Sequence, residues 1–333
     1  MGKNLTLGEL TAKPGEKVSG WLHIADSGLE IPVSLICGMQ DGPTVLVTGG
    51  IHNAEYVGIQ AAIELREKLK PSQMRGKVIL FPLVNRTGFE HRTMSMVYED
   101  GKNLNREFPG RADGTAAEQI CHAVSAELLE RADYYIDLHS GDGYEEMHPY
   151  AYYVGPVEAQ VRELSFQMAR RVRVNYLVES QCTTKGAYNY ASASGIPSVL
   201  IERGGLGVWS REEVDLDKED VRRILAFLEI LKEKPEEPQA AGEQLVFRQV
   251  IYEHAPETGC WYPACHAGDF FRKGEILGEI RDYFGNTVYS CKALADGMIL
   301  YQTASLAVLK DGPMTAYGVL PEQKKTEGET LPE

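Results

Sequence analysis

The sequence of 333 residues has no basic excess, no long apolar run and few cysteines, and each absence excludes a class of protein. With 34 Lys and Arg against 48 Asp and Glu, the formal net charge is −14, which argues against nucleic acid as a partner. No uninterrupted apolar stretch approaches the ~20 residues of a membrane-spanning helix, so we expect no membrane partner. The six cysteines are scattered without a Cys-x-x-Cys pair, which argues against a disulfide framework and favours a reducing compartment.

Three catalytic signatures are also absent. The sequence has no Gly-x-Ser-x-Gly elbow, so a serine hydrolase is unsupported, and its glycine-rich stretches lack both the Walker lysine and the dinucleotide pattern. The first residues contain no apolar segment of the kind found in signal peptides, so we expect a cytoplasmic protein. With 43% hydrophobic and 25% charged residues, the composition is that of an ordinary soluble globular protein.

The chain divides into two parts that differ in their pattern of hydrophobic residues. In the first part apolar runs alternate with helical stretches, which predicts an α/β fold with a mainly parallel sheet covered on both faces. The expected strands are residues 45–48, 77–84, 134–138 and 197–201, and the expected helices are residues 58–69, 115–131, 157–172 and 219–231. Residues 1–40 are expected to form an irregular start with short strands.

A segment rich in proline and charge separates the two parts. We assign residues 1–235 to the α/β domain and residues 236–244 to the linker. After the linker, short strand-like runs alternate with glycine turns, which predicts a small all-β domain over residues 245–322. The polar tail over residues 323–333 is expected to be disordered.

Two histidines and a glutamate that follow apolar runs form the most informative pattern in the chain. His52-x-x-Glu55 comes after a Gly-Gly pair at the end of one run, and His139 ends another. Because sites form beyond the carboxyl ends of parallel strands, we expect these three side chains to meet. Two imidazoles and one carboxylate bind zinc and leave a fourth position open for water, whereas the alternative is a metal-free pair of hydrogen-bonded histidines. Asp137 could hold an imidazole tautomer from behind or be a structural strand residue.

One further strand end and one loop carry candidates for catalysis and substrate binding. Glu202 directly follows the apolar run over residues 197–201 and could take a proton from water at the metal. The alternative is a structural ion pair between Glu202 and Arg203. The loop with Asn105 and Arg106 could clamp a substrate carboxylate, or be an asparagine turn beside a surface arginine.

These residues occur in the same order as in the succinylglutamate desuccinylase/aspartoacylase family, which the sequence resembles from about residue 38 to residue 320. The motifs that carry the resemblance are His52-x-x-Glu55, Arg92, Asn105-Arg106-x-Phe-Pro-Gly, Asp137-Leu-His139 and Glu202-x-Gly-Gly205. Within this family, which belongs to the zinc carboxypeptidase group, the sequence looks most like the bacterial N-acetyl-diaminobutyrate-deacetylase-like branch.

The resemblance implies a fold and a metal site. The fold would be a zinc-carboxypeptidase-like α/β/α domain with a mixed, mainly parallel sheet, followed by a barrel-sandwich-like all-β domain that closes over the site. One zinc ion per chain would be bound by His52, Glu55 and His139.

The resemblance also implies roles in catalysis. Glu202 would be the general base and then the general acid, and Arg92 would face the oxyanion. Asn105 and Arg106 would grip a carboxylate of the substrate.

Two points depart from the family or stay open. The family usually has glycine after the first histidine, where this chain has Asn53, a residue that tolerates a left-handed backbone better than most. The family can also use a tyrosine of the closing domain, and the sequence does not decide among Tyr252, Tyr262, Tyr283 and Tyr317.

The sequence therefore predicts a zinc-dependent amidohydrolase that removes an acyl group from an N-acylated amino acid or a related amine. Two other functions stay open, namely a metallocarboxypeptidase acting on short peptides and a non-catalytic zinc- or ligand-binding protein. The expected partners are small-molecule N-acyl amino acids or acyl-amines. The sequence leaves the acyl group, the amine and the oligomeric state open, a homo-oligomer being one option.

Overall fold

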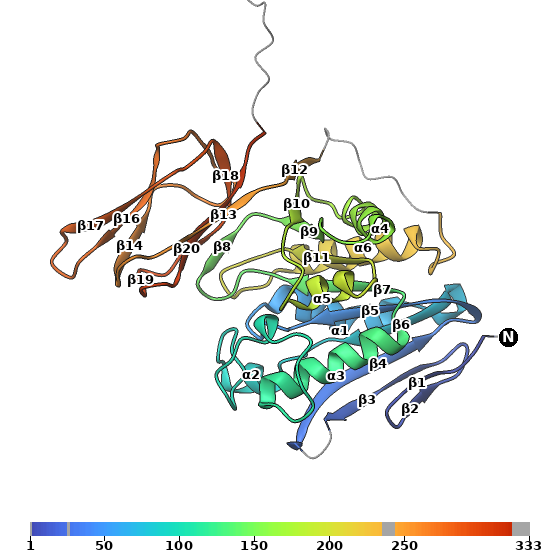
Figure 1. Cartoon of the computed structure of the whole chain (residues 1–333). Coiled ribbons are helices and arrows are strands. Elements are labelled where there is room, and N and C mark those ends of the chain that lie inside the picture. The colour runs from blue at the N-terminus through green and yellow to red at the C-terminus, as the bar shows by residue number, and fades with distance from the viewer. Residues whose placement is uncertain (1, 25–26, 235–243, 322–333) are drawn as a thin grey trace, which may run out of the picture.

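The computed structural model describes residues 2–24, 27–234 and 244–321 (Figure 1). An α/β region makes up most of the chain, and antiparallel sheets form the C-terminal region, which confirms the predicted fold class. Most of the expected linker and the whole expected tail lie outside the described residues. No helix in the described part of the chain combines the length and the apolar character needed to cross a membrane.

The α/β region is organised around a nine-stranded mixed sheet. In sheet order its strands are β12 (Leu245–Phe247), β10 (Tyr176–Ser180), β9 (Tyr150–Val154), β11 (Ser198–Glu202), β7 (Tyr134–His139), β5 (Gln40–Gly49), β6 (Arg75–Phe81), β4 (Leu29–Cys37) and β3 (Lys17–Ile24). Five of its eight strand pairings are parallel, including the central β11–β7–β5–β6 series. A small hairpin of β1 (Leu5–Leu7) and β2 (Leu10–Ala12) packs against β3 and β4.

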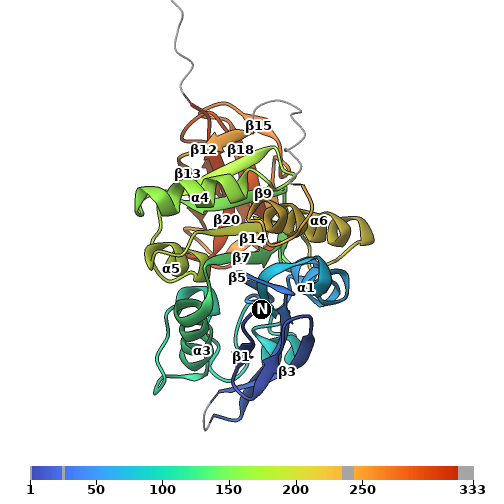
Figure 2. The same ribbon diagram turned by 90° about the vertical axis from the view of Figure 1, so that its right-hand side faces the viewer.

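Helices cover both faces of this sheet, as Figure 2 shows. One face is covered by α1 (Tyr56–Lys68), α4 (Ala159–Ala169) and α6 (Arg211–Phe227), and the other by α3 (Ala116–Arg131) and α5 (Ala187–Ala193). The interior strands are buried on both sides, because β-branched and leucine side chains of the central strands alternate between two separate apolar clusters. The remaining helical turns are α2 (Arg86–His91), η2 (Pro71–Gln73) and η3 (Leu104–Arg106).

Several element bounds differ from the sequence-based expectations. The helix expected over residues 219–231 begins at Arg211, where the hydroxyl of Ser210 accepts a hydrogen bond from Glu213 N at 3.1 Å, and it ends at Phe227. Its first two turns are mostly charged, so hydrophobic periodicity does not mark them. The expected irregular start contains the two long strands β3 and β4, which pair along eight residues.

The C-terminal region consists of two antiparallel sheets packed face to face. One contains β13 (Val250–His254), β20 (Pro313–Val319), β18 (Gly297–Thr303), β15 (Phe270–Phe271) and β8 (Glu145–Met147), and the other contains β17 (Thr287–Lys292), β16 (Ile276–Arg281), β14 (Gly259–Pro263) and β19 (Ala307–Val308). Trp261 and Ile280 of the second sheet pack with Ile299, Met314 and Tyr317 of the first.

The two regions exchange strands. β8 comes from the α/β part of the chain but pairs with β18, whereas β12 lies after the undescribed segment and joins the central sheet beside β10. The C-terminal sheets are therefore joined to the α/β region by strand pairing as well as by side chains.

A buried cluster of charges lies under α6. Arg203 is 3% exposed, and its guanidinium donates to Asp220 Oδ2 at 2.5 Å and to Arg173 O at 3.2 Å. Asp217 is fully buried beside this pair, and neither of its carboxylate oxygens has a hydrogen-bond partner among the described residues. Burial raises the pKa of Asp217 to about 8, with Arg203 opposing the shift and Asp220 adding to it.

We predict that Asp217 makes the stability of the protein depend on pH. A carboxyl group whose pKa is raised by folding stabilises the folded state fully at pH values below its ordinary pKa of 3.8. This stabilisation declines as the pH rises from there and is lost once the pH passes about 8. Asp217→Asn should flatten the decline in the free energy of unfolding over this range, measured by denaturant titration at several pH values. Asp215→Asn, on the exposed face of the same helix, is the control and should keep the decline. An unchanged slope in Asp217→Asn would show that this carboxyl is not the responsible group.

Candidate active site

The carboxyl ends of three neighbouring strands bring the predicted metal ligands and the predicted base together. His139 and Glu202 are the last residues of β7 and β11, and they are paired in the parallel register. The loop after β5 carries His52, and Glu55 is the N-cap of α1. These side chains therefore share one edge of the sheet, as expected of a site in an α/β fold.

Two glycines allow the loop and the helix to approach the sheet so closely. Gly50 has φ +63°, a conformation that side chains disfavour, and it turns the chain sharply at the end of β5. A Cβ atom on Gly58 of α1 would lie 2.8 Å from Cβ of Leu138, so α1 rests directly on β7. Glu55 is thereby held next to His139 although 84 positions separate them.

Glu55 stands between the two histidines. Its Oε1 lies 2.7 Å from Nδ1 of His52, and its Oε2 lies 2.8 Å from Nδ1 of His139. The ligand atoms of the three residues all lie within 4.8 Å of one another. Nδ1 of each imidazole thus faces the carboxylate of Glu55. Two imidazole nitrogens and one carboxylate are a donor set of the kind that binds zinc.

The opposite nitrogen of each imidazole faces a side-chain oxygen, although only the contact of His52 has hydrogen-bond geometry. His139 Nε2 lies 3.3 Å from Asp137 Oδ2, and His52 Nε2 lies 3.1 Å from Asn103 Oδ1. Outer acceptors of this kind fix the tautomer that turns the other nitrogen toward a metal. Asp137 in turn accepts a hydrogen bond of 2.7 Å from the hydroxyl of Thr48. This arrangement fits a metal site, because His52 does not depend on Glu55 alone for its orientation and Asp137 lies beside the outer nitrogen of His139.

Electrostatics also favour a cation between these residues. Burial opposes the ionisation of Glu55, but His139 and His52 outweigh it and bring the pKa of Glu55 down to about 2. Burial opposes the charged form of His139, but Glu55 and Asp137 outweigh it and raise the pKa of this imidazole well above its ordinary value. The pocket therefore attracts a positive charge, and a metal ion would take the place of the proton.

Glu202 is half-buried, and it forms no ion pair with a cation among the described residues. Its Oε2 has no hydrogen-bond partner among the described residues. Arg203, which sequence reasoning offered as an ion-pair partner, instead binds Asp220 on the far side of the strand. Burial raises the pKa of Glu202 well above its ordinary value, with His139 opposing the shift and Glu55 adding to it. A carboxyl group in this state is suited to proton transfer, and a nearby dication would favour its ionised form.

Arg92 lies at the C-terminal end of α2 with φ +55°. Its side chain is exposed, and it forms no hydrogen bond or ion pair with the residues that the structure describes. The segment that carries it is tied to the site, because Ser95 donates a hydrogen bond of 2.8 Å to Asp142, three residues after His139. The structure thus ties the segment after Arg92 to the loop after His139, and the role of Arg92 toward an oxyanion stays a prediction.

Asn105 and Arg106 lie in η3, one turn beyond Asn103. The Asn105 oxygen accepts a hydrogen bond of 3.0 Å from Ala187 N at the start of α5, so its amide nitrogen is the group left to contact a substrate. The guanidinium of Arg106 is exposed apart from one hydrogen bond of 2.9 Å to the Asn105 carbonyl. Asn103, which sequence reasoning did not assign, therefore joins the metal ligands to the predicted carboxylate clamp.

The structure distinguishes among the four tyrosines that the sequence left open. Tyr252 lies with its hydroxyl 3.3 Å from that of Tyr152 in the central sheet. By contrast, Tyr262 packs under Arg281, Tyr283 is 78% exposed, and Tyr317 is buried within the C-terminal sheets.

Tyr252 and a second tyrosine, Tyr301, border the site. Burial raises the pKa of Tyr252, and the charges of Glu202 and Arg106 act on the same phenol. Burial likewise raises the pKa of Tyr301, on which Glu145, Glu202 and Arg106 also act. Tyr301 pairs with β8, a contact that no local sequence signal reveals.

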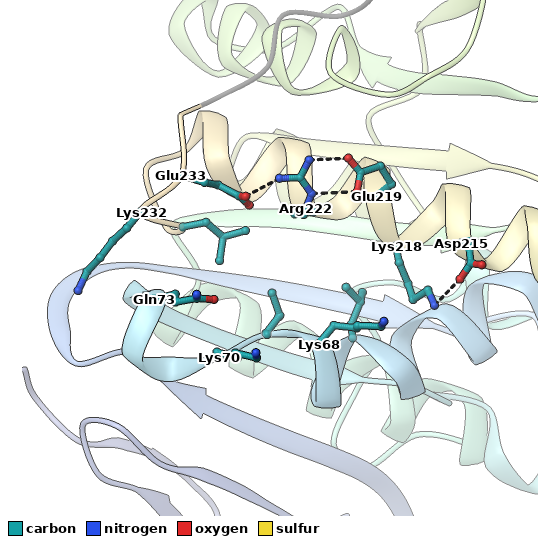
Figure 3. Close-up of a pocket in the computed structure, with 12 residues that line it drawn as sticks. Lys68, Lys70, Gln73, Asp215, Lys218, Glu219, Arg222, Lys232 and Glu233 are labelled. Carbon is teal, nitrogen blue, oxygen red and sulfur yellow. Dashed lines mark hydrogen bonds and ion pairs between the residues drawn. The ribbon is translucent and has the colours of Figure 1, made fainter.

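A separate cavity of about 490 Å³ lies between α1 and α6 (Figure 3). Its charged residues largely pair with one another, since Arg222 binds Glu219 and Glu233, and Lys218 binds Asp215. None of the predicted ligands or catalytic residues lines this cavity. It is therefore distinct from the site at the strand ends.

Comparison with known proteins agrees with this geometry. The profile of the succinylglutamate desuccinylase/aspartoacylase catalytic domain matches residues 41–228. An N-alpha-acetyl-L-2,4-diaminobutyric acid deacetylase of Halomonas elongata is 27% identical over 268 residues, which cover 76% of this chain and 74% of the relative.

Two solved structures share the fold over nearly the whole chain. The product-bound ectoine utilization protein EutE (DoeB) of Ruegeria pomeroyi is 25% identical, with a TM-score of 0.80, over 91% of this chain and 95% of that one. A succinylglutamate desuccinylase/aspartoacylase of Rhodobacter sphaeroides is 25% identical, with a TM-score of 0.77, over 90% and 94%. The chain belongs to the succinylglutamate desuccinylase/aspartoacylase family, and the resemblance inferred from its motifs is confirmed.

We predict that the purified protein carries close to one zinc ion per chain. His52→Ala and His139→Ala each remove one of the three ligands, so both variants should lose most of the metal after dialysis. Metal content is measured by inductively coupled plasma mass spectrometry. His148→Ala, which removes a half-buried histidine outside the ligand set, is the control and should keep the metal. Full zinc occupancy in the His52→Ala/His139→Ala double variant would place the metal elsewhere.

Proposed function

We propose that this protein is a zinc-dependent deacylase that hydrolyses the amide bond of an N-acylated amino acid or a related amine. The observation that carries the proposal is that Glu55 holds Nδ1 of both histidines at 2.7 and 2.8 Å, while Glu202 lies beside His139 in register. Family membership supports the reaction class. The Halomonas elongata relative is a deacetylase of an N-acetylated amino acid, which supports the substrate class.

His52, Glu55 and His139 would hold the zinc. Zinc bound there would lower the pKa of a coordinated water toward ~7 and polarise the scissile carbonyl. Glu202 accepts the proton of the attacking water and later gives it to the leaving amine, which suits a carboxyl group with a solvent-shielded oxygen and a raised pKa. Arg92, whose guanidinium has no partner in the described chain, faces the oxyanion.

Substrate binding is assigned to the loop on the other side of His52. Arg106 offers an exposed guanidinium to a carboxylate, and the amide nitrogen of Asn105 lies beside it. Tyr252 and Tyr301 would close this side of the site from the C-terminal sheets. A substrate held by its carboxylate has its acyl carbonyl presented to the base in one orientation, which converts binding energy into positioning.

The C-terminal sheets favour a small substrate over a peptide. The pairing of β8 with β18 fixes these sheets next to Glu145, at the edge of the site, where a carboxypeptidase would need an open groove. We therefore assign residues 1–235 to the catalytic domain and residues 245–322 to a domain that closes over it, with β8 and β12 each pairing into the sheet of the other part. We also propose a cytoplasmic location and small-molecule substrates only.

The assay that tests this proposal compares acetyl, succinyl, formyl and longer acyl-amino acids with short peptides. We predict turnover of at least one acyl-amino acid and none of the peptides. Glu202→Gln keeps the size of the side chain but removes the base, so it should retain zinc and lose turnover by ~10²–10⁴-fold. Peptide cleavage would favour a carboxypeptidase. Zinc without turnover of any acyl-amine would favour a binding protein, and near-normal turnover by Glu202→Gln would place the base elsewhere.

The two arginines should differ in their kinetic signatures. Arg92 acts on charge that exists only in the transition state, so Arg92→Ala should lower kcat. The expected increase in the activation free energy is about 2.7–4 kcal/mol, the cost of losing one oxyanion donor. Arg106 binds a group present in the ground state, so Arg106→Ala should mainly raise KM. Replacing the substrate carboxylate by a neutral amide should harm the wild type strongly and Arg106→Ala hardly at all. Equal losses in both proteins would show that Arg106 is not the carboxylate clamp.

A further inference from the structure

Asn53, the residue directly after the predicted ligand His52, is turned into the protein and not toward solvent. It is 1% exposed, and its Oδ1 accepts a hydrogen bond of 2.9 Å from Nδ2 of Asn85, which is fully buried. Its φ does not lie in the left-handed region, so the backbone does not require an asparagine or a glycine there. The side chain is thus placed for the contact that it makes.

Asn85 connects this contact to a short helix. It is the N-cap of α2, where its Oδ1 accepts from Gly88 N at 3.1 Å, and its Nδ2 also donates to Met96 O at 3.1 Å. Its backbone N donates to Gly50 O at 2.8 Å, in the loop that leads to His52. One asparagine therefore joins the metal-ligand loop, the first turn of α2 and the chain that follows α2.

The packing at this point leaves no free space. A Cβ atom on Gly88 would lie 2.7 Å from Oδ1 of Asn53 and 2.6 Å from both Oδ1 of Asn85 and the carbonyl oxygen of Met96. Real Cβ atoms do not approach oxygen so closely, so α2 can sit on the two amides only because residue 88 is glycine. The position of α2 relative to the metal-ligand loop is therefore set at this contact.

Arg92 is the C-cap of α2, so the position of Arg92 depends on where α2 packs. The helix has only six residues, and so short a helix is not stable without its caps and contacts. The Arg92 guanidinium makes no hydrogen bond or ion pair in the described chain, so only the backbone of α2 decides where this side chain starts. A shift of α2 would move Arg92 without breaking any bond of its side chain.

We propose that Asn53 is a positioning residue that acts through Asn85 and α2 to hold Arg92 at a fixed place relative to the metal ligands. This inference rests on the function proposed above, in which Arg92 faces the oxyanion. Asn53 itself does not touch the substrate. Its contribution is geometric, because catalysis is sensitive to displacements of a catalytic group by about 1 Å.

The test is a double-mutant cycle between Asn53→Ala and Arg92→Ala. Asn53→Ala should keep its zinc and its KM while kcat falls by between about 10-fold and about 100-fold, because the acceptor of Asn85 is lost and α2 moves. In the Arg92→Ala background the same substitution should cost less than about 2-fold, since the residue through which it acts is gone. Asn85→Ala should behave like Asn53→Ala. Thr87→Ala, which removes only a surface hydrogen bond of α2 to Glu99, is the control and should keep the wild-type kcat.

The outcomes separate this inference from the proposed function. Suppose that Arg92→Ala lowers kcat and that Asn53→Ala lowers kcat by the same factor with and without Arg92. The positioning role is then wrong and the proposed function stands. If Asn53→Ala loses zinc, the residue supports the metal ligand and not Arg92, which also overturns the inference. If Arg92→Ala leaves kcat unchanged, the oxyanion assignment and the inference that rests on it both fail.

Discussion

The shared carboxylate of Glu55 is the interaction on which the site depends. It is buried at the first turn of α1 and lies within 2.8 Å of one nitrogen on each of two histidines from different strand ends. Burying a carboxylate is costly unless charged or hydrogen-bonding partners compensate, and here two imidazoles and the backbone N of Ser140 do so. The close packing of α1 on β7 through Gly58 and the sharp turn at Gly50 are the conditions that allow this arrangement.

The C-terminal region borders the candidate site because strand pairing joins it to the α/β region. β8 leaves the α/β region to pair with β18, and this pairing carries Glu145 and Tyr301 to the edge of the site. Tyr252 reaches the central sheet through Tyr152. The positions of Tyr252 and Tyr301 thus depend on contacts between residues at least 100 positions apart in the sequence.

The meeting of His52, Glu55 and His139 was predictable because these residues follow apolar runs that can be read locally, and parallel strands bring their carboxyl ends to one edge. The position of Glu202 beside His139 was predictable for the same reason. Other features depend on long-range geometry that no local pattern encodes. The acceptor Asn103, the membership of β12 in the central sheet and the contact between Asn53 and Asn85 all belong to this group. The start of α6 was missed because its first turns are charged, although Asp217 is buried there and Glu213 lies 3.7 Å from Arg203.

The central claim is that His52, Glu55 and His139 bind zinc together. Anomalous diffraction at the zinc absorption edge, from crystals of the wild-type protein, tests this claim most directly. The account predicts one strong anomalous peak at about 2.0–2.2 Å from a nitrogen of each histidine and an oxygen of Glu55. A zinc-replete crystal with no peak between these three residues, or with its peak at another group of side chains, would contradict it.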